Sequence, residues 1–177
     1  MPDQRQLREL QAPLKQLYSE RPETALITLT AEGVVDFKRI GCRVPLLVND
    51  GRELLAGLHP AAAGNGMMAC SGELLLQALV TCAGTTFAAV ATAMDLRIFS
   101  CRIVASAVMD FRGTMGVDRD VPVGIQSLQL VFQVRSDAAE EQLQKLLSLT
   151  ERYCVVYQTL SAGAAITAQL QLLQTDS

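Results

Sequence analysis

The main candidates for reactive residues in this chain are its five cysteines, at positions 42, 70, 82, 101 and 154. A cysteine acts as a nucleophile only as the thiolate, and a free thiol with a pKa of about 8.5 needs a cationic or dipolar neighbour to ionise at neutral pH. The five show neither CxxC spacing nor a dense framework, which argues against a zinc site and a secreted disulfide scaffold. We therefore expect free thiols, no metal and no cofactor.

Two of these thiols, Cys82 and Cys154, lie on predicted helical stripes of apolar residues. Cys82 stands inside the uncharged stretch 74–94, and Cys154 comes one turn after the apolar face formed by residues 143–150. Both side chains are therefore expected to point inward. The other three are expected to be inert core thiols, the usual state of free cysteine: Cys42, Cys70 and Cys101.

The elements that position these residues follow from the spacing of apolar side chains. A spacing of three and four predicts helices over residues 4–20, 71–94 and 137–154, with a short helix or turn to 160. Alternation predicts strands over 25–30, one or two within 34–48, then 96–111, 128–135 and 166–172. Loops are expected at 49–51, 58–69 and 112–122. This order predicts an α+β fold in which an antiparallel sheet packs on a buried central helix.

Polar residues mark the starts of the predicted helices. Ser71 is expected to be the N-cap of the central helix, and Glu73 falls in its first turn, where the helix dipole favours an anion. Asp137 and Glu140 fit a capping pattern for the helix that leads toward Cys154.

The uncharged stretch 74–94 is long enough to cross a membrane. It also contains Gln77 and four threonines, and Glu73 and Asp95 close its two ends. These polar residues favour a fully buried central helix over a membrane span.

The composition excludes other classes of protein. The net charge is −3, no block of Lys or Arg stands out and there is no Trp, so the basic patch and stacking surface of a nucleic-acid binder are missing. The chain begins with a polar segment rather than an apolar signal core, and a cytoplasmic protein is expected. Half of the residues are hydrophobic, which indicates that a second subunit covers part of the surface.

Two segments carry a resemblance to a known family. Ser71-Gly-Glu-Leu-Leu-Leu-Gln-Ala-Leu-Val-Thr-Cys82-Ala-Gly resembles the central-helix motif of the OsmC/Ohr proteins. Glu151-Arg-Tyr-Cys154-Val-Val-Tyr-Gln-Thr-Leu160 resembles their second cysteine motif, and Asp110-Phe-Arg-Gly113 fits the strand end between the two. The resemblance covers roughly residues 25–173. It predicts an OsmC-like domain over 25–177 and an N-terminal helical extension over 1–24.

The resemblance implies a thiol peroxidase that reduces organic hydroperoxides. Cys82 would be the peroxidatic residue, which becomes a sulfenic acid, and Cys154 would be the resolving residue, which condenses with it to a disulfide. A dithiol reductant, of which lipoyl groups are one kind, would then restore both thiols. The family fold further implies an intertwined homodimer with the sites near the interface.

The groups that would support the thiolate depart from the family pattern. The family places a glutamate ten residues before the first cysteine, where this chain has Gly72, and Glu73 is its nearest replacement. The family arginine has no counterpart in the stretch that leads to the helix, which leaves four candidate basic residues: Arg43, Arg52, His59 and Arg112.

Two other functions stay open from the sequence. The chain could be a non-catalytic dimeric binding module with an apolar pocket and inert cysteines. It could also carry out acyl transfer, which needs a Cys–His pair, with His59 as the sole histidine.

Overall fold

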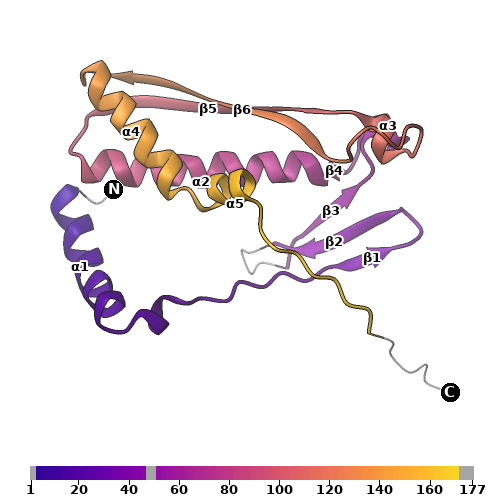
Figure 1. The fold of residues 1–177 in the computed structure, drawn as a ribbon, viewed down its shortest axis with the longest axis horizontal. Helices are drawn as coiled ribbons and strands as arrows, with labels where there is room; N and C mark the ends of the chain where they lie inside the picture. Colours follow the sequence, from indigo (N-terminus) through magenta and orange to yellow (C-terminus); the bar gives the residue numbers. More distant parts are fainter. Residues whose placement is uncertain (1–2, 47–50, 172–177) are drawn as a thin grey trace.

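The computed structural model describes residues 3–46 and 51–171 (Figure 1). In chain order the elements are α1 (Gln4–Glu20), η1 (Pro22–Ala25), β1 (Val34–Asp36), β2 (Gly41–Pro45), β3 (Glu53–Gly57), η2 (Pro60–Ala62), β4 (Ala69–Cys70), α2 (Ser71–Ala93), β5 (Ile98–Met109), α3 (Phe111–Thr114), β6 (Ile125–Ser136), α4 (Glu140–Tyr153) and α5 (Val155–Ala162).

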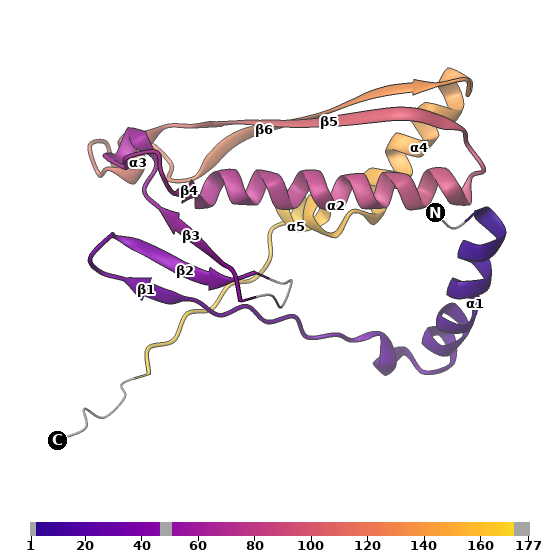
Figure 2. The same ribbon diagram turned by 180° about the vertical axis from the view of Figure 1, so that it is seen from behind.

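The strands form two separate sheets. One has the order β1-β2-β3-β4, with antiparallel pairs except for the parallel pair β3–β4. The other is a long antiparallel ribbon of β5 and β6, in which Ile103 lies opposite Phe132. Helix α2 runs along this ribbon, while the small sheet lies beyond the N-terminal end of α2 (Figure 2). The predicted α+β class is therefore confirmed.

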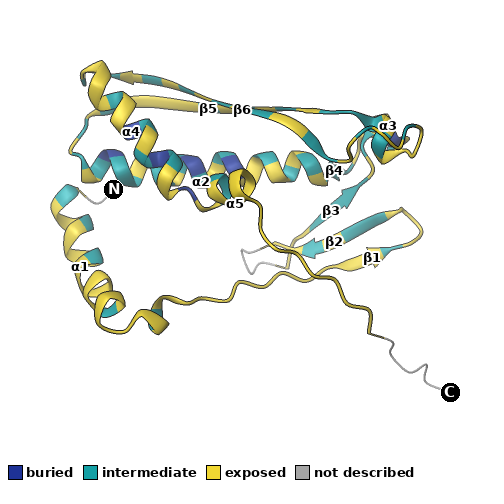
Figure 3. Cartoon of the chain, viewed as in Figure 1, coloured by how far each residue is buried: buried dark blue, intermediate teal, exposed yellow. Residues whose placement is uncertain are grey.

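The core lies between α2, the ribbon and the helices α4 and α5. Every fourth residue of α2 is buried there, because this spacing keeps side chains on one helical face: Leu79, Ala83, Phe87 and Ala91. From α4, Leu146 and Thr150 complete this buried zone (Figure 3). The ring of Phe87 stacks on Phe132 of β6 with centroids 5.4 Å apart.

The remaining faces of α2 are half-buried or exposed, so the expectation of a fully buried helix is wrong for this chain. Leu75, for example, is 39% exposed. By length and composition α2 could cross a membrane, but core helices of folded domains pass the same test. Here α2 packs against β5, α4 and α5.

Two predicted strands do not form. Residues 26–33 follow η1 without a strand partner, and residues 163–171 also have no regular structure. Both segments expose apolar side chains almost completely: Leu26, Ile27, Leu29, Ile166 and Leu170. A strand exists only where a second strand accepts its hydrogen bonds, and alternation alone does not supply that partner. The sequence also gave no indication of β3, and most of the expected turn at 49–51 lies outside the described residues.

The observed caps differ from the predicted ones. The N-cap of α2 is Cys70 rather than Ser71, and the Glu73 carboxylate accepts the Cys70 N–H at 3.3 Å. The N-cap of α4 is Ala139, whose N–H donates to Gln142 at 3.1 Å. The Asp137–Glu140 pattern is therefore wrong, because the helix begins later than that pattern requires.

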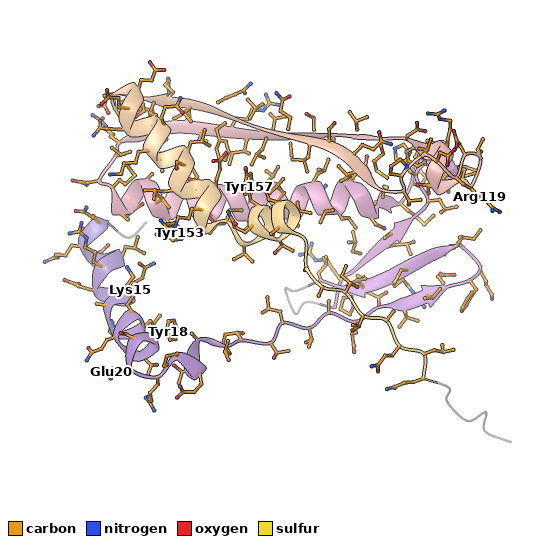
Figure 4. All side chains as sticks on the ribbon, in the orientation of Figure 1. Lys15, Tyr18, Glu20, Arg119, Tyr153 and Tyr157 are labelled. Carbon is orange, nitrogen blue, oxygen red and sulfur yellow. The ribbon has the colours of Figure 1, made fainter. Side chains whose placement is uncertain are left out.

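Helix α1 has the predicted bounds and an N-terminal capping box between Asp3 and Gln6. It is tied to the C-terminal end of α2 by a hydrogen bond from Gln4 to the Ala93 carbonyl at 2.9 Å. Its later turns extend away from α2, and Tyr18 is 39% exposed there (Figure 4). The boundary at residue 24 stays a prediction.

Candidate active site

A break between two helices positions Cys154. Helix α4 ends at Tyr153, and Cys154 has extended backbone angles (φ −74°, ψ 109°) before α5 starts at Val155. Its N–H still closes α4 onto the Thr150 carbonyl at 2.9 Å, while its carbonyl accepts the Gln158 N–H at 2.9 Å. Cys154 thus caps both helices.

This break creates free hydrogen-bond donors. The first N–H groups of any α-helix lack an acceptor within the helix and carry partial positive charge. At the start of α5 these groups belong to Val155, Val156 and Tyr157, and hydrogen bonding from them acts to lower the pKa values of the Cys82 and Cys154 thiols. A helix start therefore points at both thiols.

The surroundings of Cys82 favour its thiolate. Burial alone raises the pKa of the Cys82 thiol, but hydrogen bonding from the Val156 N–H, the Cys154 thiol, the Val155 N–H and the Thr86 hydroxyl outweighs it. The pKa of Cys82 therefore lies below its ordinary value. Among the described residues, no charged side chain takes part in this effect, so neutral donors alone lower the pKa.

Cys154 has the opposite tendency. Burial raises the pKa of its thiol, and the hydrogen bond with Cys82 and the negative charge of Cys82 raise it further, while the N–H groups of Tyr157 and Val156 act against this. Only 1% of Cys154 is exposed. A neutral thiol is thus held next to a sulfur that ionises more readily, and the two cysteines named from the sequence are brought together.

The walls around this pair are apolar. Leu79 and Ala83 form a buried cluster with Cys154, and half-buried side chains of the ribbon pack against it: Ile103, Ala105, Leu128, Leu130 and Phe132. Tyr157 closes the cluster from α5, where α5 lies against α2 (Figure 4). Cys82 itself is half-buried rather than fully inside.

The acid and the histidine named from the sequence lie elsewhere. Glu73, His59 and Cys70 line a cavity of about 330 Å³ at the N-terminal end of α2. The His59 ring stacks on Phe111 at 4.9 Å, and its Nδ1 accepts the Ala61 N–H at 3.0 Å. Glu73 accepts the Cys70 N–H, so it acts as a helix-start anion rather than as a partner of Cys82.

The arginines also have other positions. Arg112 binds Asp110 at 2.6 Å and lies 3.7 Å from Asp118, which holds the loop after β5 together. Its hydrogen bonds and charge hold the pKa of the Asp110 carboxyl below its usual range. Arg43 is exposed on β2, opposite Val34 and Leu55.

Cys101 is not a core residue, contrary to expectation. A register shift between Ile98 and Ser100 changes the strand's alternation at this point, and Cys101 is exposed at one edge of an apolar cavity of about 340 Å³ between α2 and β5. Partial burial in that cavity raises the pKa of the Cys101 thiol.

A family model for OsmC-like proteins matches residues 64–169. The chain belongs to the OsmC-like protein family. The match begins before α2 and ends after α5, so it includes both cysteines of the site. The resemblance inferred from the two cysteine motifs is therefore confirmed.

Solved structures share the OsmC-like fold with this chain at low sequence identity. An OsmC-like protein from Mycoplasma pneumoniae is 15% identical with a TM-score of 0.61, covering 77% of this chain and 89% of that chain. An organic hydroperoxide resistance protein from Elizabethkingia anophelis is 14% identical with a TM-score of 0.59, covering 77% and 91%. The organic hydroperoxide resistance protein OhrB of Bacillus subtilis is 18% identical with a TM-score of 0.53, covering 76% and 92%. Comparison with curated proteins finds no significant match.

Within this OsmC-like chain, sequence reasoning missed the groups that act on Cys82. Two of them, the N–H groups of Val155 and Val156, are backbone atoms and leave no signature in side-chain type. The third, Thr86, lies four residues after Cys82 and therefore on the same helical face. That spacing was a usable signal.

Proposed function

We propose that this OsmC-like protein is a thiol peroxidase that reduces organic hydroperoxides through Cys82 and Cys154. The observation that supports it most strongly is the pairing of a thiol of lowered pKa with a buried, protonated thiol beside it. Two proteins of similar fold are organic hydroperoxide resistance proteins, which agrees with this choice of substrate.

The proposed reaction has three steps. The Cys82 thiolate attacks the outer oxygen of the hydroperoxide, the O–O bond breaks, and the alkoxide leaves and takes a proton to become an alcohol. Cys82 is now a sulfenic acid, which the Cys154 thiol attacks to form a disulfide and release water. A dithiol reductant, oxidised in turn to its own disulfide, restores both thiols by exchange.

The apolar walls favour an organic substrate. Leu79, Ala83 and the ribbon side chains around the thiols are apolar, and they would contact the hydrocarbon part of an alkyl or aryl hydroperoxide. A cytoplasmic location fits the need for a dithiol reductant.

A homodimer belongs to the same proposal. Segments 26–33 and 163–171 are unpaired and expose alternating apolar side chains, with Leu29 at 88% and Ile166 at 90%. Pairing with a second copy would satisfy their backbone groups and cover these side chains. Analytical ultracentrifugation should give the mass of two chains, and a mass of one chain would contradict the dimer.

The peroxidase is tested by counting free thiols after one equivalent of cumene hydroperoxide under non-reducing conditions. Two of the five thiols should disappear, and peptide mass mapping should find a Cys82–Cys154 disulfide. Replacing Cys82 by Ser should abolish peroxide consumption, while the matched Cys101→Ser variant should keep it. A Cys82→Ser protein that consumes peroxide at the wild-type rate would refute the proposal.

Two observations favour a second candidate, the non-catalytic binding module. The described residues place no cation at Cys82, and an apolar cavity of about 340 Å³ lies between α2 and β5. Five unchanged thiols after hydroperoxide treatment would support this module, particularly if an apolar ligand raised the melting temperature.

A further inference from the structure

The four threonines of α2 do not use their hydroxyl groups in the same way. Thr81 donates to the Gln77 carbonyl at 2.9 Å, Thr85 to the Thr81 carbonyl at 2.9 Å, and Thr92 to the Ala88 carbonyl at 2.8 Å. This back-bond to the preceding turn is the usual arrangement for threonine inside a helix. In the part of the chain that the structure describes, Thr86 makes no such bond.

The position of Thr86 explains the difference. It follows Cys82 by four residues, which places both side chains on one helical face, and helical side chains lean toward the N-terminus. The Thr86 side chain therefore leans over the turn that carries Cys82. A hydroxyl has one proton to donate. If the Thr86 hydroxyl donates to the Cys82 sulfur, it therefore cannot also donate to the Cys82 carbonyl.

The environment strengthens such a bond. Thr86 is half-buried, whereas Thr81 and Thr85 are exposed. Hydrogen bonding from the N–H groups of Val155 and Val156, at the start of α5, acts on the same sulfur. Donors that surround one acceptor in a partly water-excluded site stabilise a negative charge there more strongly than they do in water.

We propose that Thr86 is a catalytic residue of this site, whose hydroxyl donates to the Cys82 thiolate and, together with the first turn of α5, replaces a cationic side chain. The proposal rests on the proposed function in one respect, that Cys82 is the reacting nucleophile. It adds that the thiolate is held by neutral donors. The same donor would remain in contact with the sulfur while it is attacking the hydroperoxide.

The test measures the pH dependence of iodoacetamide alkylation at Cys82 in the full chain, with tandem mass spectrometry to separate Cys82 from Cys70. Thr86→Val should raise the midpoint by about one pH unit and lower the rate at pH 7 about tenfold. The rate at high pH, where Cys82 is fully ionised, should stay close to the wild type. Loss of packing alone would not shift the midpoint while leaving this plateau intact.

Two further variants control for fold and chemistry. Thr86→Ser keeps the hydroxyl and should restore the wild-type midpoint, and Thr85→Val removes a hydroxyl already used by a carbonyl and should leave the midpoint unchanged. If Thr86→Val did not fold, Thr86→Ala would take its place in the same measurement. A midpoint for the hydroxyl-free variant equal to the wild type, or shifted equally in Thr85→Val, would overturn the assignment.

The salt dependence of the alkylation midpoint distinguishes neutral donors at Cys82 from a cationic side chain. Raising the salt concentration from about 0.01 to about 1 M shortens the screening length from about 30 to about 3 Å, yet the wild-type midpoint should barely move. A midpoint that rises steeply with salt would show that an arginine holds the thiolate and overturn the proposal. These measurements use no peroxide, so they can succeed even where the peroxidase proposal fails, and the reverse is equally possible.

Discussion

Two regions along α2 each bring a cysteine to the start of a helix, and they differ in what the free N–H groups contact. At the N-terminal end, Cys70 caps α2 itself, and its N–H is taken by the Glu73 carboxylate. In the middle of the helix, Cys82 faces the start of α5, where the N–H groups of Val155 and Val156 act on its sulfur.

The two regions of α2 also differ in their polar side chains. The cavity at the N-terminal end holds the acid and the imidazole that catalytic chemistry commonly uses, but Glu73 and His59 already accept backbone N–H groups. Among the described residues, the groups that shift the pKa of Cys82 include no carboxylate, imidazole or cationic side chain. At Cys82, therefore, backbone and hydroxyl donors lower the pKa of the thiol, whereas the acid and the imidazole accept backbone N–H groups at the N-terminal end of α2.

The largest expected effect comes from Cys154→Ser. The variant should still reduce one equivalent of hydroperoxide, because Cys82 and its donors remain, but turnover with a dithiol should fall to background, since the sulfenic acid has no resolving thiol. Trapping with dimedone and intact mass would detect the sulfenic acid. The matched Cys70→Ser variant should turn over normally, and loss of turnover there would remove the distinction between the two regions.

The next largest expected effect is on stability, because side chains are packed more tightly around the thiol pair than at the N-terminal end of α2. Leu79 is 1% exposed beside Cys154, so Leu79→Ala is expected to lower the free energy of unfolding by about 2–5 kcal/mol. Leu76 lines the cavity at the N-terminal end and is only half-buried, so Leu76→Ala should lose roughly half as much. Urea denaturation measures both, and equal losses would contradict the view that the thiol pair lies in the tighter core.

The pH dependence of thiol reactivity gives a smaller effect. The pKa of Cys82 is lowered and that of Cys101 is raised, so Cys82 should reach half of its maximal alkylation rate at a lower pH than Cys101. Because the folded pKa of Cys82 lies below its unfolded value, its stabilising contribution is present above the unfolded pKa and is lost as pH falls through the folded one. Site-resolved alkylation between pH 6 and 10 would check the order, and Cys101 reacting at the lower pH would contradict it.

Much of the fold could be predicted from the sequence, because helices are specified locally. Helix α1 has the predicted bounds, and α2 and β6 lie close to theirs, since each has a long periodic apolar pattern. The strands predicted at 25–30 and 166–172 do not form within the described residues, although their alternation is as clear. Strand formation depends on a partner elsewhere, and no local pattern reports whether the chain provides one.

The site could be predicted only in part. Cys82 and Cys154 were identified from their motifs, and the structure brings them together. The break at Cys154 has no Gly or Pro to signal it, so the donors at the start of α5 could not be foreseen. Glu73 and His59 were chosen by residue type, but sequence cannot show that nearby N–H groups already use them.

The smallest effect concerns Gly72, the residue that stands where the family pattern has glutamate. A Cβ at this position would lie 3.4 Å from Met109 Sδ and 3.8 Å from Cys70 Sγ, which are ordinary contacts. Because alanine loses less backbone entropy than glycine in a helix, Gly72→Ala should raise the free energy of unfolding by about 0.5–1 kcal/mol. Urea denaturation measures this gain, while the alkylation midpoint of Cys82 should stay at the wild-type value, because Gly72 lies ten residues away along α2. A shifted midpoint would mean that the cavity and the thiol pair act as one site, and the distinction between the two regions of α2 would then have to be given up.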